Sequence, residues 1–194
     1  MHPIICSFGP VYIYSYGVMV AVAFGVAYFL IWRNAGRFGV DRVRACDLLV
    51  YVMISGIAGA RLFHVMVNAG FYLKHPFEIF MLTRGGLAFY GGLAAACAFT
   101  LFYVRRFSLP LWTVADLFAP YIALGQAIGR IGCYFNGCCY GGYCPEGHYG
   151  IMLPGEEIAR YPVQLYASIA LVLIYCVLRF MQEKGILRGS LFAV

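Results

Sequence analysis

The chain contains the stretch Gly125-Gln126-Ala127-Ile128-Gly129-Arg130-Ile131-Gly132-Cys133-Tyr134-Phe135-Asn136-Gly137, which follows more than two helical turns of apolar residues. A guanidinium does not lose its proton in a protein, so Arg130 stays charged at membrane depth. Placing such a charge at the centre of a bilayer helix costs at least ~2.5–3.5 kcal/mol, and it usually faces a partner or a wet cavity. Together with Arg61 on an earlier apolar segment, Arg130 indicates a site for an anion inside the membrane, where lipid phosphate is the most abundant anion.

The composition defines the class of protein. Hydrophobic residues make up 63% of the 194 residues and charged residues only 11%, with a mean hydropathy of +0.80. A soluble domain usually holds about 25% charged residues, so the chain is predicted to be a polytopic membrane protein. The net charge of +6 is then a signal of topology, and no nucleic-acid partner is expected because no basic stretch resembles a nucleic-acid groove.

The apolar runs predict an all-α bundle of about five transmembrane helices in a single domain, 1–194. Each run is long enough to cross a hydrocarbon core of ~30 Å, and none alternates as a barrel strand would. The predicted spans lie near 12–32, 48–67, 86–104, 113–135 and 163–180. Residues 189–194 resemble the start of another apolar span, so we expect the chain to be truncated there.

The charges between these spans predict the orientation. Basic loops remain cytoplasmic, and the basic residues gather after the first, third and fifth spans: Arg33, Arg37, Arg42, Arg44, Arg105, Arg106, Arg179, Lys184 and Arg188. The N-terminus is therefore expected outside, and the segment 136–162 is expected to form a periplasmic loop.

Glycine is abundant within the predicted spans, with 23 in the chain. Small residues let membrane helices approach closely, which accounts for most of them. The pairs Gly85-Gly86 and Gly91-Gly92 are also expected to interrupt a helix and offer backbone amides to a headgroup. No internal repeat is evident, so an inverted-repeat transporter gains no support.

Three groups of residues are candidates for chemistry. Arg61 and His64 share a helix face and could together bind a phosphate. The structural alternatives are an ion pair of Arg61 with Asp116 and a helix-packing role for His64. Gln126, Arg130 and Asn136 combine a bidentate guanidinium, amides and a turn, which phosphate oxygens favour. Pro162 fits the first turn of a helix, which would place Arg160 at the membrane interface and Gln164 and Tyr166 inside it.

Four cysteines lie close together in the sequence: Cys133, Cys138, Cys139 and Cys144. Their spacing of four, none and four residues does not match the usual two residues between metal ligands, so neither a metal site nor another cofactor is expected. An oxidising periplasmic loop would allow one disulfide. The sequence also lacks the common hydrolase, phosphate-loop, zinc-protease and dinucleotide motifs.

Several motifs follow one another along the chain: His2-Pro3-Ile4, Ile13-Tyr14-Ser15-Tyr16-Gly17, Gly59-Ala60-Arg61, Gly85 to Leu93, Asp116 to Pro120, Gly129 to Gly137, and Arg160 with Pro162 to Tyr166. In this order they resemble the motifs of the bacterial prolipoprotein diacylglyceryl transferases. The resemblance implies transfer of a diacylglyceryl group from phosphatidylglycerol to the lipobox cysteine of a preprolipoprotein in the bacterial inner membrane. A thioether forms and glycerol 1-phosphate leaves.

The same resemblance implies Tyr16, Arg130 and Asn136 as site residues, and the sequence itself suggests the others. Tyr16, Tyr90, Arg130 and Asn136 are expected to be catalytic, with Arg130 holding the phosphate. Arg61, Gln126, Arg160 and Gln164 are expected to help bind phosphatidylglycerol. The nucleophilic thiolate belongs to the substrate, so the enzyme needs no cysteine of its own.

The chain also departs from the family pattern. Many members have a histidine, a proposed base, where Tyr90 stands, and the family has a final helix with another essential arginine. Two alternatives therefore accompany the transferase prediction. One is a degenerate relative that binds lipid or lipoprotein without turnover, and the other is a thiol-redox or metal-binding membrane protein built around the cysteines.

Overall fold

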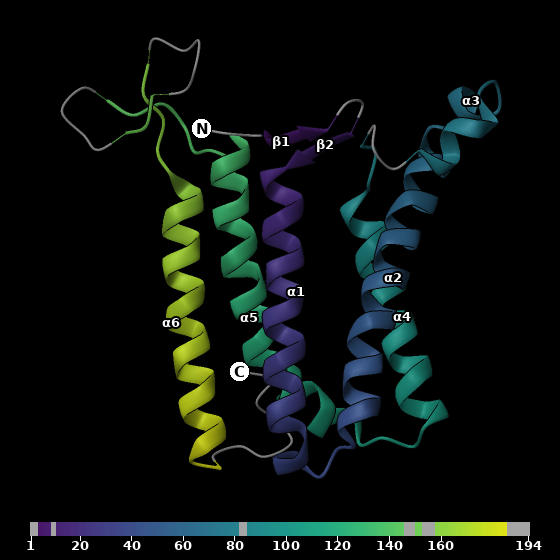
Figure 1. The fold of residues 1–194 in the computed structure, drawn as a ribbon, viewed down its shortest axis with the longest axis vertical. Helices are drawn as coiled ribbons and strands as arrows, with labels where there is room; N and C mark the ends of the chain where they lie inside the picture. The colour runs from purple at the N-terminus through teal and green to yellow at the C-terminus, as the bar shows by residue number, and fades with distance from the viewer. Residues whose placement is uncertain (1–3, 9–10, 82–84, 146–149, 153–157, 186–194) are drawn as a thin grey trace. The chain divides into compact units, whose positions relative to one another are not determined.

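The computed structural model describes residues 4–8, 11–81, 85–145, 150–152 and 158–185, and it is mainly helical (Figure 1). The helices are α1 (Ser15–Asn34), α2 (Arg42–Val67), the short α3 (Ala69–Tyr72), α4 (Phe89–Arg106), α5 (Leu111–Asn136) and α6 (Val163–Glu183). Two 3₁₀ turns span Ala35–Phe38 and Pro76–Phe80, and β1 (Ile4–Phe8) pairs with β2 (Val11–Tyr14) in an antiparallel hairpin. The predicted all-α class is confirmed.

Four stretches of the described chain are long and apolar enough to cross a membrane: Ser15–Phe38, Arg42–Val67, Leu111–Asn136 and Val163–Glu183. The remaining predicted span, 86–104, forms α4, which has 18 residues and ends in two arginines. It begins only at Phe89, because Gly85 and Gly86 have φ angles of 80° and 79° that no helix accommodates. The chain is a multi-pass membrane protein. The predicted start of another span, 189–194, lies outside the described residues.

The described chain divides into two compact units, which are considered separately. The first unit contains Met1–Asn34 and Ala115–Val194, and the second contains Ala35–Val114. The first unit therefore holds α1, nearly all of α5, and α6, while the second holds α2, α3 and α4.

In the second unit, α2 and α4 touch through glycines. A Cβ atom on Gly59 would lie 2.7 Å from the Gly91 carbonyl oxygen, and one on Gly91 would lie 2.6 Å from the Gly59 oxygen. Side chains would force these backbones apart, so the two glycines allow close helix packing. The expected interruption of a helix at Gly91-Gly92 is wrong, because both residues lie inside α4. The chain entering α4 also donates from Ala88 N to Ala60 O at 3.0 Å.

In the first unit, α5 runs antiparallel to α1 and α6. Gly132 faces the Met19 side chain of α1, with 2.9 Å between an added Cβ and the Met19 Cβ. On the other side, the Ser168 hydroxyl of α6 donates to the Ala127 carbonyl at 3.0 Å. The C-terminal end of α5 therefore meets the N-terminal ends of α1 and α6.

A proline inside α5 creates a second link to α6. Pro120 has no N–H, so it cannot bond to the carbonyl four residues earlier, at Asp116. The Gln182 side chain donates to that carbonyl at 2.6 Å, and Arg179 donates to Gln182 Oε1 at 2.9 Å. The polar end of α6 thus supplies the hydrogen bond that the α5 backbone lacks.

Candidate functional site

The C-terminal end of α5 closes in a Schellman turn. Gly137 has a φ of 71° and donates to Tyr134 O at 3.2 Å, while Cys138 N donates to Cys133 O at 3.1 Å. These are the two hydrogen bonds of that motif, which usually brings the residue after the glycine against the residue three positions inside the helix. Here those two residues are Cys138 and Cys133, so the helix cap itself brings two thiols together.

Arg130 lies less than two turns before this cap and has an exposed side chain. Among the described residues, no hydrogen-bond or ion-pair partner accepts from its guanidinium. Its five N–H donors are therefore free for a ligand from outside the described chain. Asn136 is the last residue of α5 and is half-buried within the same cap.

The Tyr16 side chain joins Arg130 at this end of the unit. Tyr16 is the second residue of α1 and is 44% exposed, and its ring lies 3.4 Å from where a Cβ on Gly132 would be. Its hydroxyl is within electrostatic range of Arg130 and of the three cysteines that follow. The structure thus brings together Tyr16 and Arg130, two of the residues predicted to be catalytic.

Three thiols converge beside them. The sulfur atoms of Cys133, Cys138 and Cys139 all lie within 4.8 Å of one another, and Cys139 Sγ donates to Cys138 Sγ at 3.5 Å. That hydrogen bond is the main cause that raises the pKa of the Cys139 thiol above its ordinary value. Cys144 is buried and does not belong to the group, and every described cysteine is a free thiol.

Gln164, in the first turn of α6, forms a hydrogen bond to the turn that follows α5. It is only 1% exposed, and its Nε2 donates to the Cys138 carbonyl at 2.6 Å. Its Oε1 has no hydrogen-bond partner within the described chain. Gln164 therefore contacts the turn that carries the thiols, and the predicted contact between Gln164 and phosphatidylglycerol stays a prediction.

Arg160 belongs to the folded loop between α5 and α6. Its guanidinium lies 4.4 Å from the centre of the Tyr143 ring and donates to the Tyr143 hydroxyl at 3.2 Å. Its backbone exchanges hydrogen bonds with Ile151 at 2.9 and 3.0 Å. These contacts tie three passes of the loop to one another. The predicted periplasmic location of 136–162 and the lipid contact of Arg160 stay predictions.

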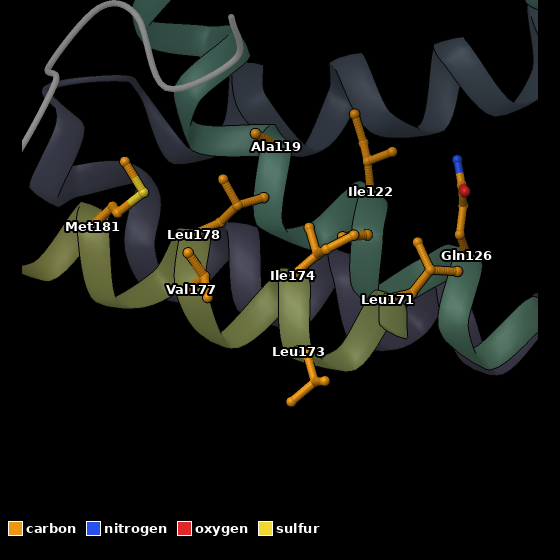
Figure 2. Close-up of a pocket in the computed structure, with 10 residues that line it drawn as sticks. Ala119, Ile122, Gln126, Leu171, Leu173, Ile174, Val177, Leu178 and Met181 are labelled. Atoms are coloured by element: carbon orange, nitrogen blue, oxygen red, sulfur yellow. The ribbon is translucent and has the colours of Figure 1, made fainter. Parts of the chain in front are cut away.

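An apolar hollow lies along α5 and α6, on the face that carries Gln126 (Figure 2). Its volume is about 550 Å³, and its lining residues are Ala119, Ile122, Ala123, Gln126, Leu171, Leu173, Ile174, Val177, Leu178 and Met181. Gln126, at one end in Figure 2, is its one amide. Arg130 follows one helical turn later, so the two side chains share a face of α5.

Arg61 has very different surroundings in the second unit. It is 7% exposed, and its Nε donates to Ile79 O at 2.9 Å. Nη1 donates to the Gly85 and Gly86 carbonyls at 2.7 and 3.1 Å, and Nη2 donates to those of Glu78 and Met81. These bonds engage every nitrogen of the guanidinium with the chain between α2 and α4. The structure favours a structural role for Arg61.

His64 and Tyr90 also belong to the second unit. His64 packs edge-on against Tyr72 with 6.0 Å between ring centres, and Gly86 leaves room for its Nε2, which a Cβ would approach to 2.7 Å. This environment supports helix packing for His64. Tyr90 lies at the start of α4 and is 76% exposed. Its catalytic role stays a prediction.

The convergence of the three thiols was missed by the sequence analysis. Cysteine spacing was compared with metal motifs, in which two residues usually separate the ligands. A glycine that follows an apolar helix and precedes two cysteines was the available signal, because a C-terminal cap closes a five-residue separation.

Fold and site together define a multi-pass membrane protein in which an exposed arginine, Arg130, has no hydrogen-bond acceptor among the described residues. The family model described as prolipoprotein diacylglyceryl transferase matches residues 3–194. The chain belongs to the prolipoprotein diacylglyceryl transferase family.

Three relatives named phosphatidylglycerol–prolipoprotein diacylglyceryl transferase illustrate this membership. The chain is 33% identical to the relative from Paracidovorax citrulli over 177 residues. This aligned region covers 84% of the chain and 66% of the relative. It is 32% identical to that of Shouchella clausii, covering 95% and 70%. It is 34% identical to that of Geobacillus kaustophilus, covering 95% and 72%. The matched region is thus about two thirds of the length of these relatives.

Proposed function

We propose that this protein transfers a diacylglyceryl group from phosphatidylglycerol to the lipobox cysteine thiol of a bacterial prolipoprotein. The thiolate sulfur attacks the diacylglyceryl carbon that bears the phosphate, and the carbon–oxygen bond breaks. The electron pair of that bond leaves with glycerol 1-phosphate, and a thioether remains. The names of the relatives support both substrates.

The exposed, unengaged guanidinium of Arg130 is the observation that carries this proposal. Negative charge grows on the phosphate as the carbon–oxygen bond breaks, so a fixed cation beside it lowers the barrier. A guanidinium meets two phosphate oxygens at once, and no hydrogen bond within the described chain competes for Arg130. Asn136 ends the same helix, Tyr16 of α1 packs near Gly132 of that helix, and we assign both to the proposed phosphate site.

The apolar hollow supports a lipid substrate. Its aliphatic lining suits an acyl chain, while Gln126 and Arg130 mark the step from apolar to polar along one face of α5. We assign Gln126 a hydrogen bond to the headgroup. Gln164 and Arg160 are assigned to positioning, because their observed contacts hold the turn and the loop.

We place the reaction at the outer face of the bacterial inner membrane. The basic segments Arg33 to Arg44 and Arg105-Arg106 favour the cytoplasmic side for one end of the helices. The C-terminal end of α5 then faces the periplasm, where a lipobox cysteine emerging from a secreted chain could meet it.

The test is a transfer assay with the protein expressed in its complete reading frame. Purified protein is mixed with phosphatidylglycerol that is labelled in its headgroup glycerol and with a lipobox peptide. The expected result is released glycerol phosphate in equal amount to diacylglyceryl peptide, measured by mass spectrometry. Lipid binding without either product would overturn the proposal and support the degenerate relative.

A further inference from the structure

Cys133, Cys138 and Cys139 form a group with the shape of an open metal site. A zinc ion bound by three thiolates at ~2.3 Å needs sulfur atoms about 3.8 Å apart in a tetrahedron. The three sulfurs already lie within 4.8 Å of one another, with one pair at 3.5 Å. Small rotations of the side chains would bring them to ligand distances.

The backbone around the group is held for this arrangement. The Schellman turn closes Cys138 onto Cys133, and Gln164 holds the Cys138 carbonyl at 2.6 Å. Cys139 has a φ of 64°, a left-handed conformation that is unfavourable for a residue with a Cβ. Strain of this kind persists where the surrounding structure enforces it, and it clusters at functional sites.

The charge beside the group also fits. Zinc with three thiolates carries one net negative charge, which a nearby cation stabilises. Arg130 lies less than two turns before the cap that carries the group, and its side chain is exposed. Because Cys139 is exposed, the group is open to a further ligand.

The proposed transfer requires a thiolate, and the residues gathered here do not include an ordinary base. Tyr16, which has a reference pKa of ~10, and Cys139 lie within electrostatic range of Arg130. We propose that Cys133, Cys138 and Cys139 bind Zn²⁺ and leave its fourth position to the lipobox thiol. This proposal rests on the proposed transferase function, and it replaces the expectation of no metal that the cysteine spacing suggested.

The chemistry of this step balances. A thiol that coordinates zinc loses its proton, and the proton passes to water. The zinc-bound sulfur then attacks the diacylglyceryl carbon, the carbon–oxygen bond breaks, and its electron pair leaves on the phosphate beside Arg130. Three protein ligands with one open position are the usual set in catalytic zinc sites.

Metal content provides the first test, without any activity measurement. Purified protein incubated with Zn²⁺ and passed through a desalting column should hold about one zinc per chain, a value set by one three-ligand site. Cys139→Ser, an exposed substitution, should lose most of it, and Cys133→Ser should behave alike. Cys176→Ser, which removes an exposed thiol of α6, should keep it. Equal zinc in all variants, or no zinc in the parent, would overturn the proposal.

Cobalt provides the second readout. With Co²⁺ in place of zinc, the thiolate-to-metal absorption should rise by about one third when a lipobox peptide adds a fourth sulfur to three. A peptide with serine at the lipobox position should cause no rise, and an unchanged spectrum with the cysteine peptide would overturn the open-site assignment. Tight copper(I) binding with zinc excluded would overturn it too, because trigonal copper leaves no position for the substrate.

Transfer separates this proposal from the proposed function. A chelator should abolish transfer at saturating lipid, and Zn²⁺ should restore it, while phosphatidylglycerol binding stays unchanged. Transfer that persists in zinc-free protein would sink the metal site and leave the transferase intact. Zinc and cobalt signals as expected without any transfer would uphold the metal site and sink the transferase.

Discussion

Arg61 and Arg130 have similar surroundings in the sequence but opposite surroundings in the structure. Both lie in apolar, glycine-containing segments, and both resemble arginines of one family. Arg61 is buried and donates to five backbone carbonyls, whereas Arg130 is exposed and has no such acceptor in the described chain. A charged residue in an apolar helix therefore indicates a ligand site only when its hydrogen-bond donors have no acceptors in the folded chain.

The largest expected effect is on folding, at Arg61. Arg61→Lys replaces five donors on a planar group with three on one nitrogen, so several buried carbonyls lose their partners. We expect a loss of at least about 3 kcal/mol of stability, since hydrogen bonds to charged groups contribute roughly 1.5–3 kcal/mol each. The measurement is the thermal midpoint of the detergent-solubilised protein, followed by the monodisperse peak in size-exclusion chromatography.

Arg130→Lys is the matched control for that substitution. It should leave the thermal midpoint unchanged, because the described chain makes no hydrogen bond to the replaced group. If both lysine variants melted alike, the contrast between a structural and an available arginine would be broken.

The next effect is on transfer, at Arg130. Arg130→Lys retains the charge but loses the planar fork that meets two phosphate oxygens. Loss of one charge-assisted hydrogen bond at roughly 1.5–3 kcal/mol predicts a fall in kcat/KM of about 10- to 100-fold, nearly as large as for Arg130→Ala. The assay is diacylglyceryl transfer at matched protein levels. Near-normal transfer by the lysine variant would exclude the bidentate contact.

Which helices can be predicted from the sequence follows from the length of the apolar runs. Long apolar runs specify helices because a bilayer leaves backbone groups no other partner, so the ends of α1, α5 and α6 were predicted within about three residues. The start of α2 was missed, because Arg42 and Arg44 open that helix ahead of its apolar run. Of the two glycine pairs expected to interrupt a helix, Gly85-Gly86 precede α4 with positive φ angles, whereas Gly91-Gly92 lie inside it. The amino-acid composition does not distinguish a glycine that allows close helix packing from one that adopts a positive φ angle in a turn.

The site was predictable only in part. Arg130 was singled out by the cost of its charge, which depends on the residue type and its apolar neighbours alone. A structural role for Arg61 was one of two alternatives, but its partners were not predicted, because they are carbonyls 17 to 25 residues away and no side-chain pattern encodes a backbone oxygen. The same limit hid the thiol group, which depends on cap geometry and on a contact from Gln164, 26 residues distant from Cys138.

A smaller effect is expected at Gln164. This residue lies in the same unit as Arg130, but like Arg61 it is buried and donates a hydrogen bond to a backbone carbonyl. Gln164→Leu fills a similar volume and removes the donor to the Cys138 carbonyl. We expect a loss of about 1–3 kcal/mol, the cost of leaving such an acceptor unpaired. The thermal midpoint in detergent should fall accordingly. Tyr166→Leu, an exposed change two residues further along α6, is the control and should leave the thermal midpoint unchanged.

The smallest effect is expected at Gln126. Its amide is neutral and exposed, so the proposed hydrogen bond to the headgroup contributes about 0.5–1.5 kcal/mol, and Gln126→Leu should raise KM for phosphatidylglycerol by roughly 2- to 10-fold with little change in kcat. A double-mutant cycle with Arg130→Ala sharpens this test. If both side chains hold one phosphate, the two losses should not add, and the coupling should exceed about 0.5 kcal/mol. Strict additivity would mean that Gln126 only lines the apolar hollow, and Arg130 would then hold the phosphate without it.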